Sequence, residues 1–272
     1  MTSSCVSNVV DVPTTYATPA SDARVVPVAP IPSTRPVVSA RGLTFAAMAS
    51  FVLVALIGLA VSGGTTGPGG LDASSAGFRE WAASHAWSQQ PLLLIEWAFD
   101  KHTLRYWTIG LAVFLLFRRQ VLEAVLALAV MWTTLEVTGW AKALFGRDRP
   151  EWQNLEHFHE SGSFPSAHAS GTAALMGLVL VFVVLRSRQA MVRRWGAVLV
   201  GATVLAVCLD RLMLGRHYPS DLVAGVLLGG GVVLLAVALL SVLSVRANEK
   251  DATPVRVTSL PDRARVLVSR SA

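Results

Sequence analysis

Two kinds of residue are scarce in this chain, and each scarcity excludes a class of protein. Of the two cysteines, Cys5 lies in a polar stretch and Cys208 in an apolar run, so they offer no disulfide framework and no CxxC metal signature. Charged residues make up 15% of the 272 residues, well below the roughly 25% usual for soluble globular domains. Hydrophobic residues make up 53%, and the mean hydropathy is positive. The composition therefore predicts an integral membrane protein.

Apolar runs divide the chain into candidate membrane spans, each of which needs about 20 mostly apolar residues. The candidates are 44–62, 104–117, 121–139, 168–185, 195–214 and 222–245. The run 104–117 is the shortest, and it forms a full span only by extending backward through Trp97 and Phe99. We therefore expect an all-α, polytopic membrane helical bundle with six transmembrane helices over residues 44–245.

Polar stretches flank this bundle. Residues 1–43 are rich in Ser, Thr, Pro and Val without a helical period, which predicts a disordered tail, and residues 246–272 form a second polar tail. The first apolar run begins too late, and is too long, for an ordinary cleaved signal peptide. With six spans the basic connectors 118–120 and 186–194 lie on the side of both tails, which the positive-inside rule makes cytoplasmic at a cell (plasma) membrane. The connectors expected outside are 63–103, 140–167 and 211–221.

The outer connectors contain three clusters of ionisable residues. They are KALFGRDRP with Lys142 and Arg149, SFPSAHAS with Ser166, Ala167 and His168, and RLMLGRHYPSD with Arg211, His217 and Asp221. Ser166 is a candidate N-cap, so the fourth and sixth spans direct their N-termini toward the outer face. Helix N-termini and basic side chains both bind phosphate oxygens. The three clusters together predict a phosphate site.

Two histidines supply reactive groups to this predicted site. His217 and Asp221 are four residues apart, so on a helical turn they share one face and the carboxylate can orient the imidazole. His168 lies near the start of the fourth span, where it can protonate a leaving oxygen. A histidine nucleophile would form a phosphohistidine that water then hydrolyses.

The motifs K-x6-R-P at Lys142–Pro150, P-S-A-H at Pro165–His168 and R-x5-H-x3-D at Arg211–Asp221 resemble a known three-part signature. It is that of the phosphatidic acid phosphatase type 2 superfamily, the membrane lipid phosphate phosphatases. The resemblance implies dephosphorylation without metal or cofactor. It also implies roles for these residues: His217 as nucleophile, Asp221 as its partner, His168 as the acid, and Lys142, Arg149, Ser166, Arg211 and the backbone around Ala167 as the phosphate clamp.

The resemblance implies as partners the bilayer and a lipid phosphate, and not nucleic acid; the oligomeric state stays open. Candidate substrates are a polyprenyl diphosphate, phosphatidylglycerol phosphate and phosphatidic acid. Two alternatives remain: a phosphotransferase that uses an alcohol acceptor, and a non-catalytic lipid-binding or transport protein built on the same bundle.

The chain departs from the family pattern at two positions, where Ala167 replaces Gly and Asp210 replaces Ser. Alanine keeps the backbone donor, so little harm is expected. Asp210 either pairs with Arg211 and holds it, or repels a dianionic phosphate. Outside the signature, Arg147 and Arg216 are either interfacial or ion-paired with Asp148 or Glu151, or they contact a second phosphate.

Three further stretches carry weaker signals. Segment 71–100, with Trp81, Trp87 and Trp97, predicts either a short surface-lying helix or a structured loop with an aromatic core, and we assign it no chemistry. The stretch EHFHE (156–160) predicts a polar lid or a headgroup-contacting loop rather than a metal site. The glycines of 229–231 predict close helix packing.

Overall fold

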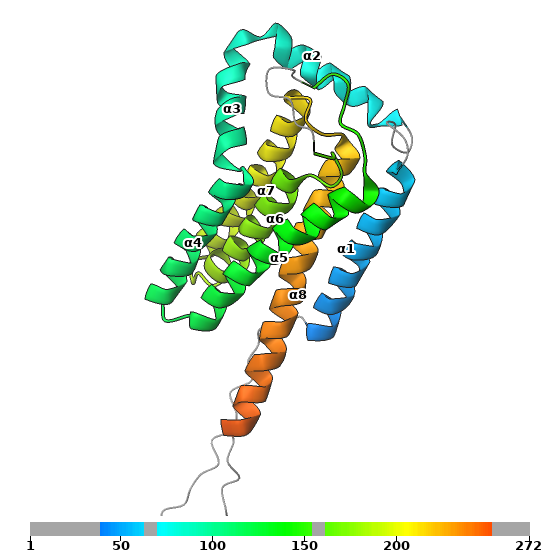
Figure 1. The fold of residues 1–272 in the computed structure, drawn as a ribbon. Coiled ribbons are helices and arrows are strands. Elements are labelled where there is room, and N and C mark those ends of the chain that lie inside the picture. The colour runs from blue at the N-terminus through cyan, green and yellow to red at the C-terminus, as the bar shows by residue number, and fades with distance from the viewer. Residues whose placement is uncertain (1–38, 63–69, 154–160, 252–272) are drawn as a thin grey trace, which may run out of the picture. The chain divides into compact units, whose positions relative to one another are not determined.

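The computed structural model describes residues 39–62, 70–153 and 161–251, and within these ranges it is helical without a strand. The long helices are α1 (Ala40–Val61), α2 (Ala76–Ser84), α3 (Gln89–Ala98), α4 (Lys101–Phe117), α5 (Val121–Phe145), α6 (Ala167–Val179), α7 (Ala190–Met213) and α8 (Pro219–Asp251). Short segments are η2 (Ala73–Ser75), η3 (Ala86–Ser88) and the π-helical η5 (Leu180–Val184). Figure 1 shows α1 and α4–α8 as a bundle.

Each predicted span coincides with one helix of this bundle. In the part of the chain that the structure describes, five helices are long and apolar enough to cross a membrane: α1, α5, α6 continued by η5, α7 and α8. The sixth, α4, has 17 residues and is therefore about 26 Å long, short of a hydrocarbon core of roughly 30 Å. An all-helical membrane bundle is confirmed, with five helices that meet the length and hydropathy of a span and a sixth, α4, that is one residue shorter than the shortest of them.

The expected backward extension of the second span is wrong. The helix α3 ends at Ala98, and Asp100 begins a new helix as its N-cap. Its carboxylate accepts hydrogen bonds from the N–H groups of His102 at 2.5 Å and Thr103 at 3.3 Å. These bonds satisfy the first donors of α4, so a separate helix begins at this point. The predicted tail boundaries also move, because α1 begins at Ala40 and α8 continues to Asp251.

Glycines let α6 and α8 pack with their backbones in contact. A Cβ at Gly229 would lie 2.1 Å from the carbonyl oxygen of Ser170, and one at Gly231 would meet an aromatic ring of α1 at 2.9 Å. The prediction of close packing at 229–231 is thus confirmed at these two positions. The same approach joins the first turns of both helices, where the Ser166 N–H donates to the Asp221 carbonyl at 3.1 Å.

Segment 71–100 forms short helices that cover the end of α7. Ala82 of α2 and Leu92 of α3 pack with Leu214 in a small apolar cluster, and Figure 1 shows α2 lying across this end of the bundle. Its three tryptophans, Trp81, Trp87 and Trp97, are 42%, 69% and 65% exposed. Short helices are therefore confirmed in this segment, and the alternative of a loop with an aromatic core is wrong; the position of these helices at the membrane surface stays a prediction. The loop 156–160, with its predicted lid role, lies outside the described residues.

Candidate active site

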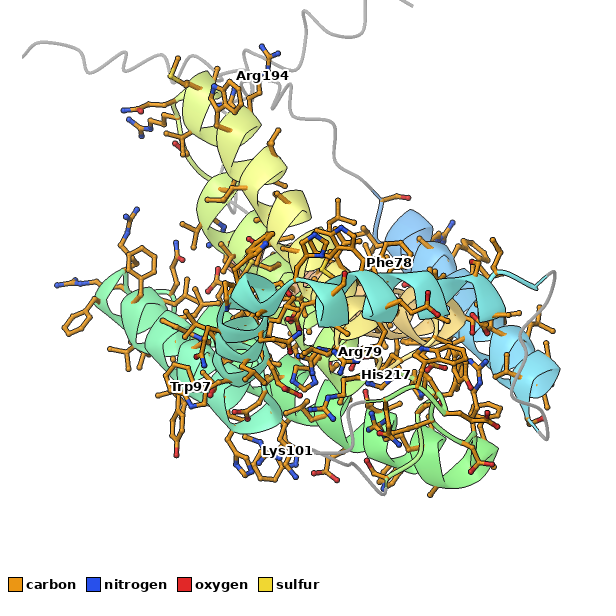
Figure 2. The ribbon with its side chains drawn as sticks, turned by 90° about the horizontal axis from the view of Figure 1, so that it is seen from above. Phe78, Arg79, Trp97, Lys101, Arg194 and His217 are labelled. Atoms are coloured by element: carbon orange, nitrogen blue, oxygen red, sulfur yellow. The ribbon has the colours of Figure 1, made fainter. Side chains whose placement is uncertain are left out.

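A cavity of about 330 Å³ lies where α5 and α7 end and α6 and α8 begin. Six of the eight predicted site residues line it: Lys142, Arg149, Ala167, His168, Arg211 and His217. The other two, Ser166 and Asp221, are completely buried behind its wall. Figure 2 shows this end of the bundle from above, with His217 toward the middle of the helices and Trp97 and Lys101 nearer the outside. The structure therefore brings all three motifs together.

His217 lies in the turn between α7 and α8 and is buried. Its Nδ1 is 3.4 Å from Oδ2 of Asp221, and the same oxygen accepts a hydrogen bond from the Tyr218 N–H at 3.0 Å. Burial, followed by the positive charges of Lys142 and Arg149, holds the pKa of His217 well below its ordinary value. The imidazole is consequently neutral at neutral pH and retains a free lone pair.

A buried network of charges lies behind the His217–Asp221 pair. Arg147 donates through Nη1 to Oδ1 of Asp221 at 2.7 Å and through Nη2 to Oδ2 of Asp72 at 2.6 Å. Asp72 also accepts hydrogen bonds from the backbone N–H of Ser220 at 3.0 Å and from its hydroxyl at 2.6 Å. Asp72 therefore ties the segment before α2 to the first turn of α8, where Asp221 lies.

Arg211, in the last turn of α7, is held by two carboxylates. Its Nε and Nη2 donate to Asp210, with 2.8 Å for Nε, and its Nη1 donates to Oε1 of Glu96 at 3.0 Å. The same Nη1 lies 3.4 Å from Nε2 of His168. Of the two alternatives for Asp210, the structure shows the one in which it pairs with Arg211 and fixes its orientation.

The two arginines outside the signature are buried in ion pairs. Arg147 pairs with carboxylates from α8 and from the segment before α2. The sequence had instead suggested Asp148 or Glu151 as its partners. Arg216 places Nε 3.3 Å from Oε1 of Glu96. Neither arginine belongs to the described residues that line the cavity. The structure therefore shows the ion-paired alternative, and contact with a second phosphate stays a prediction.

Lys142 and Arg149 present their charge to the cavity while their donors bind backbone carbonyls. The Nζ of Lys142 donates to Gly162 at 2.5 Å; Arg149 donates from Nε to Ser161 at 2.8 Å and from Nη1 to Arg216 at 2.9 Å. Burial, and then the charge of Arg216, lower the pKa of Arg149 to about 10, so it stays protonated at neutral pH. Carbonyl partners carry no net charge, so in these contacts neither side chain is neutralised by a carboxylate.

The start of α6 forms another wall of the cavity. Ser166 is its N-cap, as predicted, and the hydroxyl accepts a hydrogen bond from the Ala169 N–H at 3.4 Å. Ala167 is the first residue of the helix and lines the cavity. The free N–H groups and the positive end of the helix dipole at this position favour a bound anion.

Sequence reasoning missed the contribution of segment 71–100, which supplies two carboxylates, Asp72 and Glu96, to the arginines around the cavity. A signal existed for Glu96, because an acidic residue within the apolar stretch LLLIEWAF is unusual and often functional. No such signal marked Asp72, whose partners lie 75 and 148 residues further along the chain. Three residues at the start of α4 also line the cavity: Asp100, Lys101 and His102.

The three motifs fall within one matched stretch of the chain. Residues 120–243 match the family model described as the PAP2 superfamily. This segment belongs to the PAP2 superfamily. The PAP2 segment includes every residue from Lys142 to Asp221, and therefore the whole set of predicted site residues.

Two known proteins resemble the PAP2 segment and its surroundings. Lipid A 1-phosphatase from Rhizobium etli is 31% identical over 125 residues, which cover 39% of this chain and 47% of that protein. The match thus spans about half the length of this relative. The crystal structure of a transmembrane PAP2 type phosphatidylglycerolphosphate phosphatase from Bacillus subtilis superposes with a TM-score of 0.60 at 18% identity, over 78% of this chain and 100% of that chain. At this identity the likeness shows a shared PAP2 fold.

Proposed function

We propose that this integral membrane protein is a lipid phosphatase that hydrolyses a phosphomonoester or diphosphate through a phosphohistidine, without a metal. The observation that carries the proposal is the convergence of His217, backed by Asp221, with Lys142, Arg149 and Arg211 around one cavity. The cavity lies at the ends of the spans, at the level where lipid headgroups meet water. Membership of the PAP2 superfamily and the names of both similar proteins support the same class of reaction.

The proposed reaction has two steps. Because Nδ1 of His217 faces Asp221, Nε2 attacks phosphorus, and a nitrogen–phosphorus bond forms as the bond to the lipid oxygen breaks. Asp221 stabilises the positive charge that develops on the imidazole. His168 gives a proton to the leaving lipid oxygen and then takes one from the water that attacks phosphorus, which releases phosphate and restores His217.

A neighbouring apolar cavity supports a lipid as the substrate. It has a volume of about 200 Å³, begins at Ala98 and Phe99 beside the phosphate cavity, and continues between α4 and α6 past Trp107 and Leu175. A hydrocarbon chain fits such walls, while its phosphate reaches the cations. Candidate substrates are a polyprenyl diphosphate, phosphatidylglycerol phosphate and phosphatidic acid, to which the Rhizobium relative adds lipid A phosphorylated at position 1.

The proposal includes an orientation in the cell membrane, with both tails in the cytoplasm and the cavity outside. Its support is the distribution of arginine at the other end of the bundle, where Arg118 and Arg119 lie between α4 and α5. Four more arginines lie in the stretch 186–194, two of them between η5 and α7 and two near the start of α7. Such clusters remain on the cytoplasmic side during membrane insertion.

Phosphate release from a panel of these lipids, in the presence of EDTA, tests the proposal. Purified protein in detergent is expected to be active, and right-side-out vesicles are expected to be active without permeabilisation. Release of phosphate from none of the lipids would contradict the phosphatase assignment. Activity that EDTA abolishes would overturn the metal-free mechanism, and activity only after permeabilisation would overturn the orientation. Transfer of the phosphoryl group to a labelled alcohol instead of water would identify a phosphotransferase.

The charge of Lys142 sets a testable pH dependence. Because this charge lowers the pKa of His217, Lys142→Met is expected to raise that pKa. His217 must be neutral to attack, so the acidic limb of the kcat/KM profile moves to higher pH. On acidification, activity therefore begins to fall at a higher pH than in the wild type. The matched control is Lys101→Met, which lines the same cavity but is not among the main causes of the shift. An acidic limb that stays in place in the Lys142 variant would show that another group titrates.

A further inference from the structure

A second cavity, of about 500 Å³, lies between the α4–α5 turn and the η5–α7 connector. The helix α5 runs from this cavity at Gln120 to the phosphate cavity at Lys142. Those 22 steps correspond to about 33 Å of helix, close to the roughly 30 Å of a bilayer core. The two cavities therefore lie at opposite membrane interfaces.

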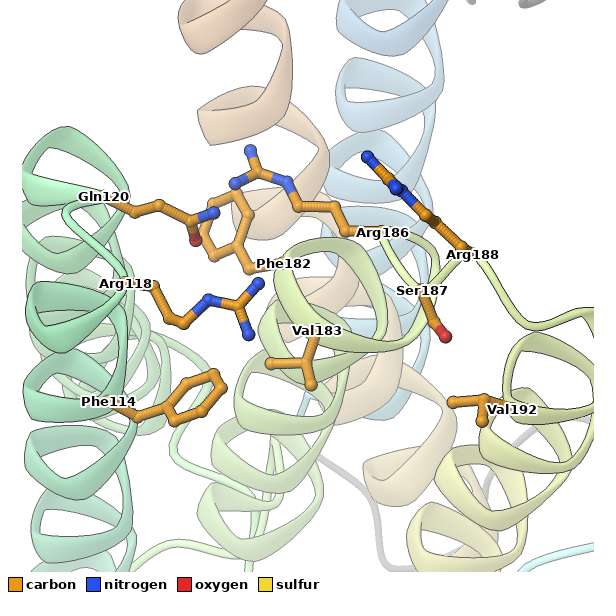
Figure 3. Close-up of a pocket in the computed structure, with 9 residues that line it drawn as sticks. All are labelled: Phe114, Arg118, Gln120, Phe182, Val183, Arg186, Ser187, Arg188 and Val192. Carbon is orange, nitrogen blue, oxygen red and sulfur yellow. The ribbon is translucent and has the colours of Figure 1, made fainter.

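Three arginines surround the second cavity. Arg118 and Gln120 reach toward Phe182 from one side, and Arg186 extends toward Gln120 from the other (Figure 3). Arg186 is ion-paired with Glu123 at 2.9 Å. Arg118 and Arg188 are exposed, and among the described residues neither is paired with a carboxylate. The cavity thus carries two positive charges that no carboxylate of the described residues balances.

Apolar side chains form the rest of this cavity and connect it with the surface that faces lipid. The ring of Phe182 is buried in its wall. Phe114, 40% exposed, lies at its edge beside Phe117, which is 84% exposed. A free anion would gain nothing from these rings, whereas a molecule with an anionic head and hydrocarbon chains matches both parts. Because the described lining contains no His, Cys, Asp or Glu, it offers binding groups and no nucleophile of the kind found around His217.

We propose that this cavity binds the phosphate of an anionic phospholipid from the leaflet opposite the active site. The guanidinium groups of Arg118 and Arg188 pair with the phosphate, the amide of Gln120 donates a hydrogen bond, and the acyl chains lie along Phe114. The site is separate from the phosphate cavity and holds whether or not the phosphatase proposal does.

Binding of phosphatidylglycerol to the delipidated full-length protein, followed by native mass spectrometry in detergent, tests this site. The variant Arg118→Gln/Arg188→Gln is expected to bind roughly 30-fold more weakly, since each basic group near a membrane surface contributes about a factor of five. The matched control is Arg119→Gln/Arg194→Gln. It changes the net charge equally in the same two stretches, and neither residue lines the cavity. The control is expected to bind like the wild type.

Several outcomes would overturn the proposal. If both double variants bound phosphatidylglycerol equally weakly, the effect would be one of general surface charge. If Arg118→Gln/Arg188→Gln bound it as tightly as the wild type, the cavity would not be the binding site. Phosphatidylcholine that binds as tightly as phosphatidylglycerol would exclude selection by charge, and competition by inorganic phosphate would assign the cavity to the free anion. Melting temperatures in detergent verify folding, and the single variant Arg188→Gln, at an exposed position, replaces the double variant if that one does not fold.

Discussion

Replacing His217 by alanine is expected to lower lipid phosphate turnover by roughly 10⁴-fold or more, the scale seen when a covalent nucleophile is removed. His217 lines the phosphate cavity, is neutral at neutral pH, and is oriented by Asp221. Another residue with an orienting carboxylate and access to the same cavity would be needed to replace it. His168 does not qualify, because its Nε2 faces the Glu96 carbonyl and Arg211. Initial rates with a saturating lipid phosphate measure the loss.

The matched control for this variant is His102→Ala. His102 lines the same cavity and is exposed, but it lies outside the three motifs. Its removal is expected to change turnover by less than about tenfold, because the proposed mechanism assigns His102 neither a bond to phosphorus nor a transfer of a proton. Labelled substrate is expected to leave an acid-labile, alkali-stable phosphoryl group on the wild type and none on the His217 variant. A His217 variant that retains a tenth of the wild-type rate would end the nucleophile assignment.

The positions of the helices follow from the sequence because each depends on local composition. Apolar runs located the six helices, and proline and serine before an apolar run located the starts of α6 and α8. The error at the second span came from treating Trp97 and Phe99 as a continuation of α4. The capping carboxylate of Asp100 was readable in the sequence and was overlooked; it ends any continuous helix through that point.

The site was predictable only where its residues belong to spaced motifs. Lys142, His168 and His217 could be grouped because helix direction places the ends of α5 and α7 beside the starts of α6 and α8. The ion pairs of Asp72 and Glu96 depend on a segment that folds back over this end, and no local pattern records contacts over such separations. For the same reason, the sequence left the two roles of Asp210 open until its contact with Arg211 was seen.

The carboxylates of segment 71–100 change how the cationic site is understood. Glu96 partly neutralises Arg211 and Arg216. The donors of Lys142 and Arg149 meet only neutral carbonyl and hydroxyl oxygens in the described contacts, so we expect these two residues to supply the main attraction for a phosphate. Asp72 balances the charge of Arg147 on the side away from Asp221. Because the positive charge of Arg147 is shared between Asp72 and Asp221, Asp221 can also orient His217 and stabilise a positive charge on it.

Replacing Asp72 by asparagine is therefore expected to affect both stability and rate. Arg147 and Asp72 are almost fully buried, and removal of one partner from a buried ion pair costs about 3 kcal/mol or more. The variant is expected to melt at a lower temperature in detergent. Below that temperature its kcat is expected to fall while KM changes little, because Asp72 does not line the phosphate cavity and reaches Asp221 through Arg147 and Ser220.

The control for Asp72→Asn is Asp148→Asn, an exposed carboxylate next to Arg147 in the chain, which is expected to change the melting temperature and kcat very little. A lower melting temperature with unchanged kcat would limit Asp72 to a structural role. A rise in KM alone would mean that Asp72 influences phosphate binding rather than the reactivity of His217. A fall in kcat measured on folded protein would connect the segment before α2 to the His217–Asp221 pair. The described contacts between them run through the guanidinium of Arg147 and through the first turn of α8.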